Sequence, residues 1–258
     1  MTQKTQKLDF SAVIKNRINE IKNVQLFENI EYSVLSQLLR LARISSYTAK
    51  KQVLRQGGEV THIYIILSGV VKVFRTDTDG NEVTLLFAQK GDALFTSCLF
   101  HNDYAQISGD VLEDTELLAI PAENVLKTSK VSSNFAFNLL RDISEKNRQL
   151  MFMVEEITLH TAMDRLGRYL LKTKLENGFY GNEFPFGIDK SLVASHLGMT
   201  PETLSRSLKK LSREGVKVGK KNVELEYSQA LCKYHDEFYD LHCPKYSTPD
   251  CPHYKGKS

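Results

Sequence analysis

The sequence lacks any uninterrupted apolar run that approaches membrane-spanning length, and its first residues, Met1 to Lys7, are polar rather than signal-peptide-like. We therefore expect a cytoplasmic protein that makes no contact with a membrane. A strong charge imbalance is also lacking, because the sequence has 34 Lys and Arg residues and 31 Asp and Glu residues, which gives a net charge of +3. The 258 residues, 41% hydrophobic and 25% charged, are typical of a globular protein with one or two domains.

Cysteine is scarce and unevenly placed. No cysteine precedes Cys98, which excludes an N-terminal cysteine-ligated metal cluster, and a disulfide framework is not expected in a reducing cytosol. The other three cysteines, Cys232, Cys243 and Cys251, lie near the end of the sequence. The last two are each followed by proline, as iron–sulfur ligands often are, but the spacings match neither a zinc ribbon nor a ferredoxin. Two interpretations stay open for these three residues: a metal site, or a reactive or merely tolerated cysteine tail.

The first half of the chain predicts short helices and then a β-structure. Apolar residues at helical spacing between positions 8 and 45 indicate the helices; they are Ile14, Ile18, Ile21, Leu35, Leu38, Leu39, Leu41 and Ile44. From Lys51 to Pro121 the apolar runs become short and rich in β-branched residues. Four glycines in this region lie eleven residues apart: Gly58, Gly69, Gly80 and Gly91. Short strands with regularly spaced turns predict an antiparallel sandwich or jelly roll.

A long helix is predicted from Ala136 to Thr161, because a heptad pattern runs through this segment. The a positions are Leu140, Asn147, Val154 and Thr161, and the d positions are Ala136, Ile143, Leu150 and Ile157. Asparagine at an a position fixes the register of a parallel two-stranded coiled coil. The interface expected for such a homodimer consists of Leu140, Ile143, Asn147, Leu150, Val154 and Ile157. The alternative is a single helix that lies on the jelly roll.

Two shorter helices follow, separated by Gly198-Met199-Thr200. A strand is expected from Phe184 to Ile188, and the first helix from Asp189 to Gly198. The second helix has Thr200 as its N-cap, proline at its first position and an apolar stripe formed by Leu204, Leu208 and Leu211. This pattern predicts a helix-turn-helix whose second helix enters the major groove of DNA. A plain αα-hairpin with a solvated basic face is the alternative.

Charge is concentrated on the second helix and on the segment after it. Between Thr200 and Lys221 there are seven basic and two acidic residues, a local charge of +5, which suits phosphate contacts. Residues 216–227 predict a β-hairpin wing with Lys220 and Lys221 at its tip. The expected DNA contacts are Thr200, Glu202, Thr203, Ser205, Arg206, Lys209, Lys210, Lys220 and Lys221.

An ordered set of features makes the chain resemble the Crp/Fnr superfamily of bacterial transcription regulators. They are Leu26-Phe27, the glycine spacing, Leu67-Ser-Gly69, Gly91-Asp92, the long helix and the winged helix-turn-helix. The resemblance implies an α+β fold with a β-roll (cupin-like jelly roll) sensor domain, a long dimerisation helix and a C-terminal winged helix-turn-helix. The expected divisions are an N-terminal helical segment (1–25), the sensor domain (26–130), the dimerisation helix (131–160), the DNA-binding domain (161–227) and a Cys/His-containing tail (228–258). The resemblance also implies a non-enzymatic protein that partners RNA polymerase and whose β-roll controls DNA binding allosterically.

The segment Glu202-Thr-Leu-Ser-Arg206 is similar to the Fnr-type reading element Glu-x-x-Ser-Arg. By this resemblance Glu202 accepts a hydrogen bond from cytosine and Arg206 donates to guanine, with Ser205 nearby. The expected target is double-stranded promoter DNA that carries a TTGA palindrome. The cyclic-nucleotide branch of the superfamily holds its ligand with a Gly-Glu-Leu … Arg-Ser/Thr-Ala pattern. Here the first part reads Phe95-Thr-Ser97 and no arginine lies between Thr76 and Leu140, which argues against cyclic AMP.

The identity of the effector is left open by the sequence. The resemblance favours redox, oxygen or nitric oxide signals, through an iron–sulfur cluster on the tail cysteines or through a haem near Cys98 and His101, with Met151 or Met153 contributing. A core cysteine and a surface histidine are the simpler interpretation of that pair. Alternatives are a regulator that answers an organic effector without metal, and a small-molecule-binding cupin-like protein. The cupin alternative has little support, because no His-x-His pair occurs in the β-region.

Overall fold

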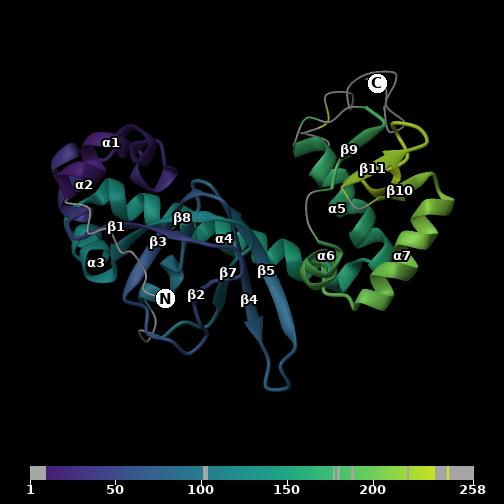
Figure 1. Cartoon of the computed structure of the whole chain (residues 1–258), viewed down its shortest axis with the longest axis horizontal. Coiled ribbons are helices and arrows are strands. Elements are labelled where there is room, and N and C mark those ends of the chain that lie inside the picture. The colour runs from purple at the N-terminus through teal and green to yellow at the C-terminus, as the bar shows by residue number, and fades with distance from the viewer. Residues whose placement is uncertain are drawn as a thin grey trace, which may run out of the picture. The chain divides into compact units, whose positions relative to one another are not determined.

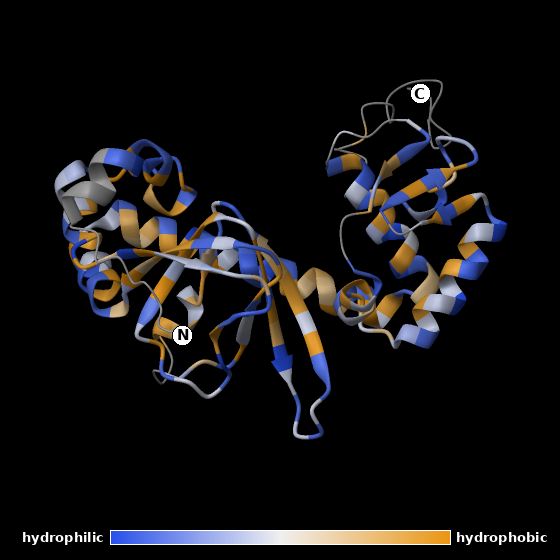
Figure 2. Ribbon diagram, in the orientation of Figure 1, coloured by the Kyte–Doolittle hydropathy of each residue, from blue (hydrophilic) through white to orange (hydrophobic). Residues whose placement is uncertain are grey.

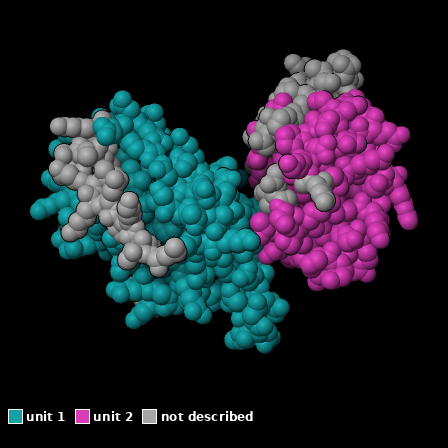
Figure 3. Space-filling model, in the orientation of Figure 1, with its two compact units in different colours: residues 1–151 teal, residues 152–258 magenta. Residues whose placement is uncertain are grey.

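The computed structural model describes residues 10–100, 104–176, 178, 181–186, 189–219, 221–235 and 243. The chain divides into two compact units, Met1–Met151 and Phe152–Ser258 (Figure 3). The boundary falls inside one continuous helix, α4 (Ser133–Leu159). Each unit has its own hydrophobic core, and Figure 2 shows where the hydrophobic residues gather in each. None of the described helices is long and apolar enough to cross a membrane.

The first unit is built from two four-stranded antiparallel sheets, with strand orders β1-β8-β3-β6 and β2-β7-β4-β5 (Figure 1). The strands are β1 (Arg43–Tyr47), β2 (Gln52–Leu54), β3 (His62–Ser68), β4 (Val70–Thr76), β5 (Glu82–Gln89), β6 (Ala93–Leu94), β7 (Ser108–Val111) and β8 (Thr115–Pro121). Ile63 lies opposite Ile120 in one sheet and Val71 opposite Ala88 in the other, and all four belong to one core. The predicted jelly roll is therefore confirmed.

The regularly spaced glycines lie at turns of the roll. Gly69, Gly80 and Gly91 have φ angles of 90°, 86° and 95°, a region that favours glycine. At Gly69 the requirement is also steric, because a Cβ atom there would lie 2.1 Å from Oγ1 of Thr115. The turn between β3 and β4 therefore admits only glycine.

Several helices complete the first unit: α1 (Phe10–Lys22), η1 (Gln25–Phe27, a 3-10 helix), α2 (Tyr32–Leu38), η2 (Thr96–Phe100, also 3-10) and α3 (Ala122–Val131). The interpretation of Leu41 and Ile44 as helical residues is wrong. Leu41 has a φ of 65° and is 76% exposed, and Ile44 lies in β1 opposite Leu118. A left-handed turn thus takes the chain from α2 into the sheet, where pairing with β8 outweighs the helical spacing. Helix α3 did not appear in the sequence-based expectations.

The second unit contains α5 (Ala162–Glu176), β9 (Glu183–Pro185), α6 (Lys190–His196), α7 (Pro201–Arg213), β10 (Val216–Val218), β11 (Asn222–Leu225) and the 3-10 helix η3 (Cys232–Tyr234). Its sheet has the order β10-β11-β9, so the expected wing is a β-hairpin with β9 paired to it. Of the strand expected to reach Ile188, the part beyond 186 lies outside the described residues. The core includes Ala230, Leu231 and Tyr234, and thus extends past residue 227, where the sequence placed the end of the domain.

Helix α4 ends at Leu159, so the expected heptad position Thr161 lies outside it. Thr161 instead lies just before α5. Its hydroxyl donates to Oδ2 of Asp164 at 2.6 Å, and the N–H of Asp164 donates back to the same hydroxyl at 3.3 Å. The N–H of Thr161 also donates to Oδ2 of Asp164 at 3.2 Å, so this arrangement satisfies two backbone N–H groups at the start of α5. The heptad register therefore stops one position earlier than predicted.

Candidate nucleic-acid interface

The turn between α6 and α7 has the geometry that its sequence requires. Asp189 caps α6 by accepting the N–H of Ser191 at 2.7 Å. The chain then reverses at Gly198, which has a φ of 60°, and the N–H of Met199 donates to the carbonyl of Ala194 at 2.9 Å. Ala194 is buried, and the two helices pack against each other. The predicted helix-turn-helix is confirmed.

The first turn of α7 holds a chain of hydrogen bonds along its exposed side. Thr200 is the N-cap, and its hydroxyl accepts the N–H of Thr203 at 3.2 Å. The two threonine hydroxyls are 3.1 Å apart, and Nη2 of Arg206 donates to the hydroxyl of Thr203 at 3.3 Å. The N-cap therefore also orients the guanidinium group that is expected to read guanine.

Helix α7 is strongly amphipathic, and Figure 2 shows hydrophobic and hydrophilic residues in succession along it. Leu204, Ser207 and Leu211 are buried in the unit's core. The opposite face carries the exposed residues Glu202, Ser205, Arg206, Lys209 and Lys210. The structure thus brings together on one surface the helical part of the residues expected to contact DNA.

Glu202 is an anion at neutral pH. Its own backbone N–H, the hydroxyl of Thr200 and the nearby charge of Arg206 hold the pKa of the Glu202 carboxyl below its usual value. An ionised carboxylate accepts hydrogen bonds only, which is what a partner for the amino group of cytosine must do. The N-terminal position in α7 adds to the stability of this charge.

The wing is fixed to the body of the second unit. The N–H of Gly219 donates to the carbonyl of Asn222 at 2.8 Å, and Nδ2 of Asn222 donates to Glu183 on β9. Nζ of Lys190, at the start of α6, donates to the carbonyl of Val218 at 3.2 Å. Lys221 is exposed on this hairpin, and Lys220 lies outside the described residues.

The far end of α7 is held by residues that the sequence did not indicate as functional. Glu214 is the C-cap of α7, and its Oε2 accepts hydrogen bonds from Tyr234 Oη at 2.9 Å and from Nζ of Lys233. Burial alone would raise the pKa of the Glu214 carboxyl, but these two donors outweigh it and lower the pKa. The ring of Tyr234 lies against Gly167 of α5, where a Cβ atom would come within 2.4 Å of the ring. A glycine in the middle of an otherwise regular helix was the only sequence signal of this contact.

The apolar residues of α4 differ widely in exposure. Leu140 and Val154 are 66% and 64% exposed, and Phe137 and Met151, which were not assigned to the interface, are 64% and 65% exposed. The expected d residues are more covered: Leu150 is 40% and Ile157 43% exposed, and Ile143 is half-buried. Asn147 is exposed and its amide lies 3.8 Å from Sδ of Met151. The most exposed stripe thus consists of Phe137, Leu140, Ser144, Asn147, Met151 and Val154.

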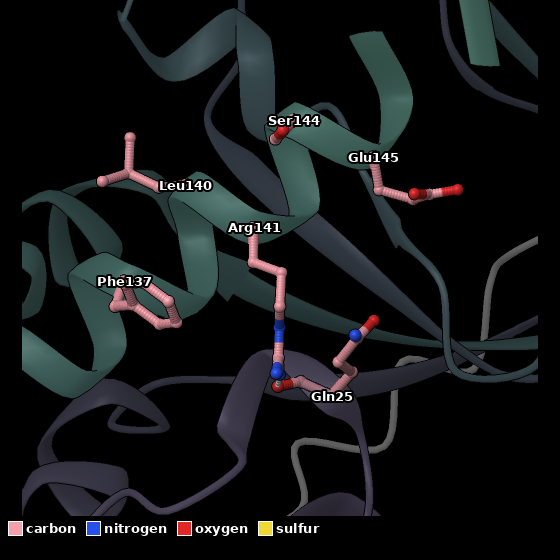
Figure 4. Close-up of a pocket in the computed structure, with 6 residues that line it drawn as sticks. All are labelled: Gln25, Phe137, Leu140, Arg141, Ser144 and Glu145. Atoms are coloured by element: carbon pink, nitrogen blue, oxygen red, sulfur yellow. Dashed lines mark hydrogen bonds between the residues drawn. The ribbon is translucent and has the colours of Figure 1, made fainter. Parts of the chain in front are cut away.

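An open groove of about 720 Å³ lies beside the first part of this stripe, lined by Gln25, Phe137, Leu140, Arg141, Ser144 and Glu145 (Figure 4). Arg141 reaches across from α4 and donates to the carbonyl of Gln25 at 3.1 Å and to Oε2 of Glu28 at 2.6 Å. This pair of contacts attaches α4 to the segment around η1. Phe137 and Leu140 remain about two-thirds exposed beside this groove.

Phe95 and Thr96, in the segment that corresponds to the start of the cyclic-nucleotide pattern, both contact other protein side chains. Phe95 has a φ of 66°, is buried, and places its ring against Gly109 of β7 and edge-on to Tyr64. The hydroxyl of Thr96 donates to Oδ2 of Asp142 at 2.6 Å, and Nζ of Lys146 donates to both groups. Thr96 occupies the position of the glutamate in the cyclic-nucleotide pattern, and its hydroxyl is therefore already hydrogen-bonded to a carboxylate of α4.

The candidate metal ligands are only partly within the described residues. Cys98 is buried in η2, and burial raises the pKa of its thiol, so the thiol is protonated at neutral pH. Met151 is exposed, Met153 is half-buried, and His101 lies outside the described residues. Cys232 and Cys243 are half-buried, and Cys251 lies outside the described residues. Within the described ranges, no group of three or more His, Cys, Asp or Glu residues is placed to hold a metal ion.

A β-roll followed by a long helix and a winged helix-turn-helix defines a class of transcription regulators, and comparison with known proteins identifies the family. Residues 44–130 match the cyclic nucleotide-binding domain and residues 164–234 the Crp-like helix-turn-helix domain. The chain is 27% identical to the cyclic AMP receptor protein of Thermus thermophilus, over 82% of this chain and 96% of that protein. It is 25% identical to the anaerobic regulatory protein of Bacillus subtilis, over 72% and 78% of the two chains.

The structure of FixK2 from Bradyrhizobium japonicum is similar in fold, with a TM-score of 0.65 at 19% identity over 76% of this chain and 98% of that one. The chain belongs to the Crp/Fnr family of transcription regulators. Its helix-turn-helix is a DNA-binding domain of that family.

Proposed function

We propose that the protein is a homodimeric, non-enzymatic regulator that reads a TTGA palindrome in promoter DNA in the cytoplasm and acts together with RNA polymerase. The main support for base-specific DNA recognition is that Glu202 and Arg206 are both exposed on the first turns of α7. The carboxylate is an acceptor of the kind that cytosine needs, and the guanidinium is oriented by Thr203. Lys209, Lys210 and Lys221 add sequence-independent phosphate contacts.

The exposed apolar stripe of α4 supports the homodimer. Four of its members are large hydrophobic side chains that are about two-thirds exposed, and they recur at the heptad spacings of three and four. Phe137, Ser144 and Met151 of the stripe each lie one residue after a predicted d position, namely Ala136, Ile143 and Leu150. We infer that Leu140, Asn147 and Val154 lie at the centre of the interface, with Ile143, Leu150 and Ile157 at its edge. A second copy of the same helix is the partner that this pattern fits.

Gel-shift titration with a TTGAT–ATCAA palindrome and a scrambled duplex of equal length tests the reading. The variant Arg206→Lys separates charge from base recognition, because lysine keeps the positive charge but cannot make the two parallel hydrogen bonds of a guanidinium group. We expect Arg206→Lys to keep binding to the scrambled duplex while losing about 1–3 kcal/mol of preference for the palindrome. Arg206→Ala should lose affinity for both, and Glu202→Gln should relax selection at one base pair. The titration is repeated with and without air, and with and without nitric oxide. If the wild-type protein binds both duplexes equally under every condition, the proposed TTGA recognition is refuted.

We further propose a redox, oxygen or nitric oxide signal in place of a cyclic nucleotide. A phosphodiester would find no arginine among residues 76–140, and the cation beside Thr96, Lys146, is already paired with the carboxylate of Asp142. The donor set available for a cofactor is the cysteine tail, of which Cys232 is attached to the second core through η3. Three cysteinates with a fourth ligand from elsewhere in the chain would hold an iron–sulfur cluster, which is the first candidate, and haem is the second. An organic effector that needs no metal is the alternative.

Purification without oxygen, followed by measurement of iron, sulfide and haem and by absorption spectra with and without nitric oxide, tests this signal. We expect iron and sulfide in the wild-type protein and neither in a variant with Cys232, Cys243 and Cys251 replaced by serine. The variant Cys98→Ser is the matched control and should retain the metal. A colourless, metal-free dimer with full DNA binding would exclude the cluster and favour the organic effector.

A further inference from the structure

The last two turns of α4, which belong to the second unit, are attached to the helix-turn-helix by Arg165. Arg165 lies in the first turn of α5. Its Nη1 donates to the carbonyl of Ile157 on α4 at 3.2 Å, and its Nη2 donates to the carbonyl of Gly198 at 3.4 Å. Gly198 is the turn residue between α6 and α7, and Thr200, the N-cap of α7, follows two residues later. One guanidinium thus joins the end of the long helix to the start of the recognition helix.

Two further contacts support the same joint. Nε of Arg168, one turn further along α5, donates to Oε1 of Glu156 at 2.6 Å, and both side chains are largely buried. The side chain of Ile157 lies against Gly198, where a Cβ atom would be 3.2 Å from Cδ1 of Ile157. A buried, hydrogen-bonded ion pair fixes geometry rather than adding much stability. The joint therefore consists of Glu156, Ile157, Arg165, Arg168 and Gly198, all within the second unit.

We propose that Arg165 is a positioning residue that sets the distance between the two recognition helices of a dimer. This inference rests on the proposed function, because it requires two copies that read two half-sites. In such a dimer the partner is held along α4, and the half-sites are separated by a fixed number of base pairs. A rigid joint between α4 and the turn before α7 fixes the position of each recognition helix relative to the α4 helices of the dimer. A loose joint costs affinity only where both helices must bind at once.

The experiment compares palindromes whose half-sites are separated by the preferred spacer and by one or two base pairs more or fewer, with the full chain. The measured quantity is the ratio of affinities between the best and the neighbouring spacers. This ratio is insensitive to the fraction of protein that is folded, so a variant that is merely unstable leaves it unchanged. Arg165→Met keeps the length of the side chain and removes both donors. Arg165→Lys keeps the charge but not the two-pronged geometry, and the exposed Arg40→Met in the first unit is the control for loss of one positive charge.

We expect Arg165→Met to lower affinity for the best spacer about tenfold and to bring the spacer ratio close to one. Arg165→Lys should resemble Arg165→Met, and Arg40→Met should resemble the wild type. If Arg165→Lys behaves as the wild type, or if Arg165→Met weakens all spacers equally and lowers the salt dependence, Arg165 is a phosphate contact and the proposal is wrong. If the wild type itself has no preference for a palindrome, the proposed function is wrong, and the role of Arg165 is rejected together with it.

Discussion

Gly167 contacts the ring of Tyr234, and this ring determines whether replacing Gly167 by alanine stabilises or destabilises the second unit. Replacing Gly167 by alanine favours α5, because alanine stabilises a helix interior by about 1 kcal/mol relative to glycine. The new Cβ atom, however, would lie 2.4 Å from the ring of Tyr234, so the ring would have to move by roughly 1 Å to reach ordinary contact. The ring is 7% exposed and its hydroxyl is bound to Glu214, which leaves it little freedom.

The magnitude follows from these two opposing effects. Overpacking of a well-packed core costs about 1–3 kcal/mol, and the anchored ring places this site near the upper end. Gly167→Ala should therefore lower the free energy of unfolding of the second unit by about 2 kcal/mol. With Tyr234 replaced by alanine the clash is absent, and the same Gly167→Ala change should raise it by about 1 kcal/mol. The expected coupling between the two positions is thus about 3 kcal/mol.

Differential scanning calorimetry or urea unfolding of the four proteins in this cycle measures the coupling. Gly181→Ala is the matched control in the same unit, because a Cβ atom there meets nothing within 4 Å. We expect Gly181→Ala to be close to neutral in both backgrounds. Equal destabilisation by Gly167→Ala with and without the Tyr234 ring would refute the argument that the ring, and not the helix itself, demands glycine.

Three further predictions concern the rest of the molecule. Leu140→Lys should shift the protein toward monomer in sedimentation experiments, whereas Val131→Lys, at a residue that is 75% exposed but outside the stripe, should not; equal effects would argue against an interface on α4. Burial lowers the pKa of His196 to about 4, so the folded state resists its protonation, and stability should fall by up to about 3 kcal/mol as the pH drops from about 6.5 to 4. His196→Phe should flatten this dependence in urea unfolding at several pH values, and an unchanged slope would assign it to other groups. Phe95→Ala should destabilise the first unit by about 3–5 kcal/mol in calorimetry, and a change below about 1 kcal/mol would mean that its ring does not fill the roll.

The features of this protein that depend on local interactions could be predicted from the order of its residues. The recognition helix is one of them, because the N-cap Thr200, the proline after it and the leucines at helical spacing act within a few residues of one another. The turn at Gly198 and the glycine turns of the roll are others, since a positive φ angle is a property of a single residue. The order of these local signals was also enough to reveal the family.

Which faces of the helices and strands are covered depends on long-range packing and could not be predicted in the same way. Heptad spacing alone did not show that Phe137 is more exposed than Ile143 on α4, because exposure depends on the packing of the whole unit. The same is true of Ile44, whose partner in the sheet is Leu118, and of Gly167, whose partner is Tyr234. Contacts between distant residues follow from the packing of whole elements, and periodicity within one element carries no record of them.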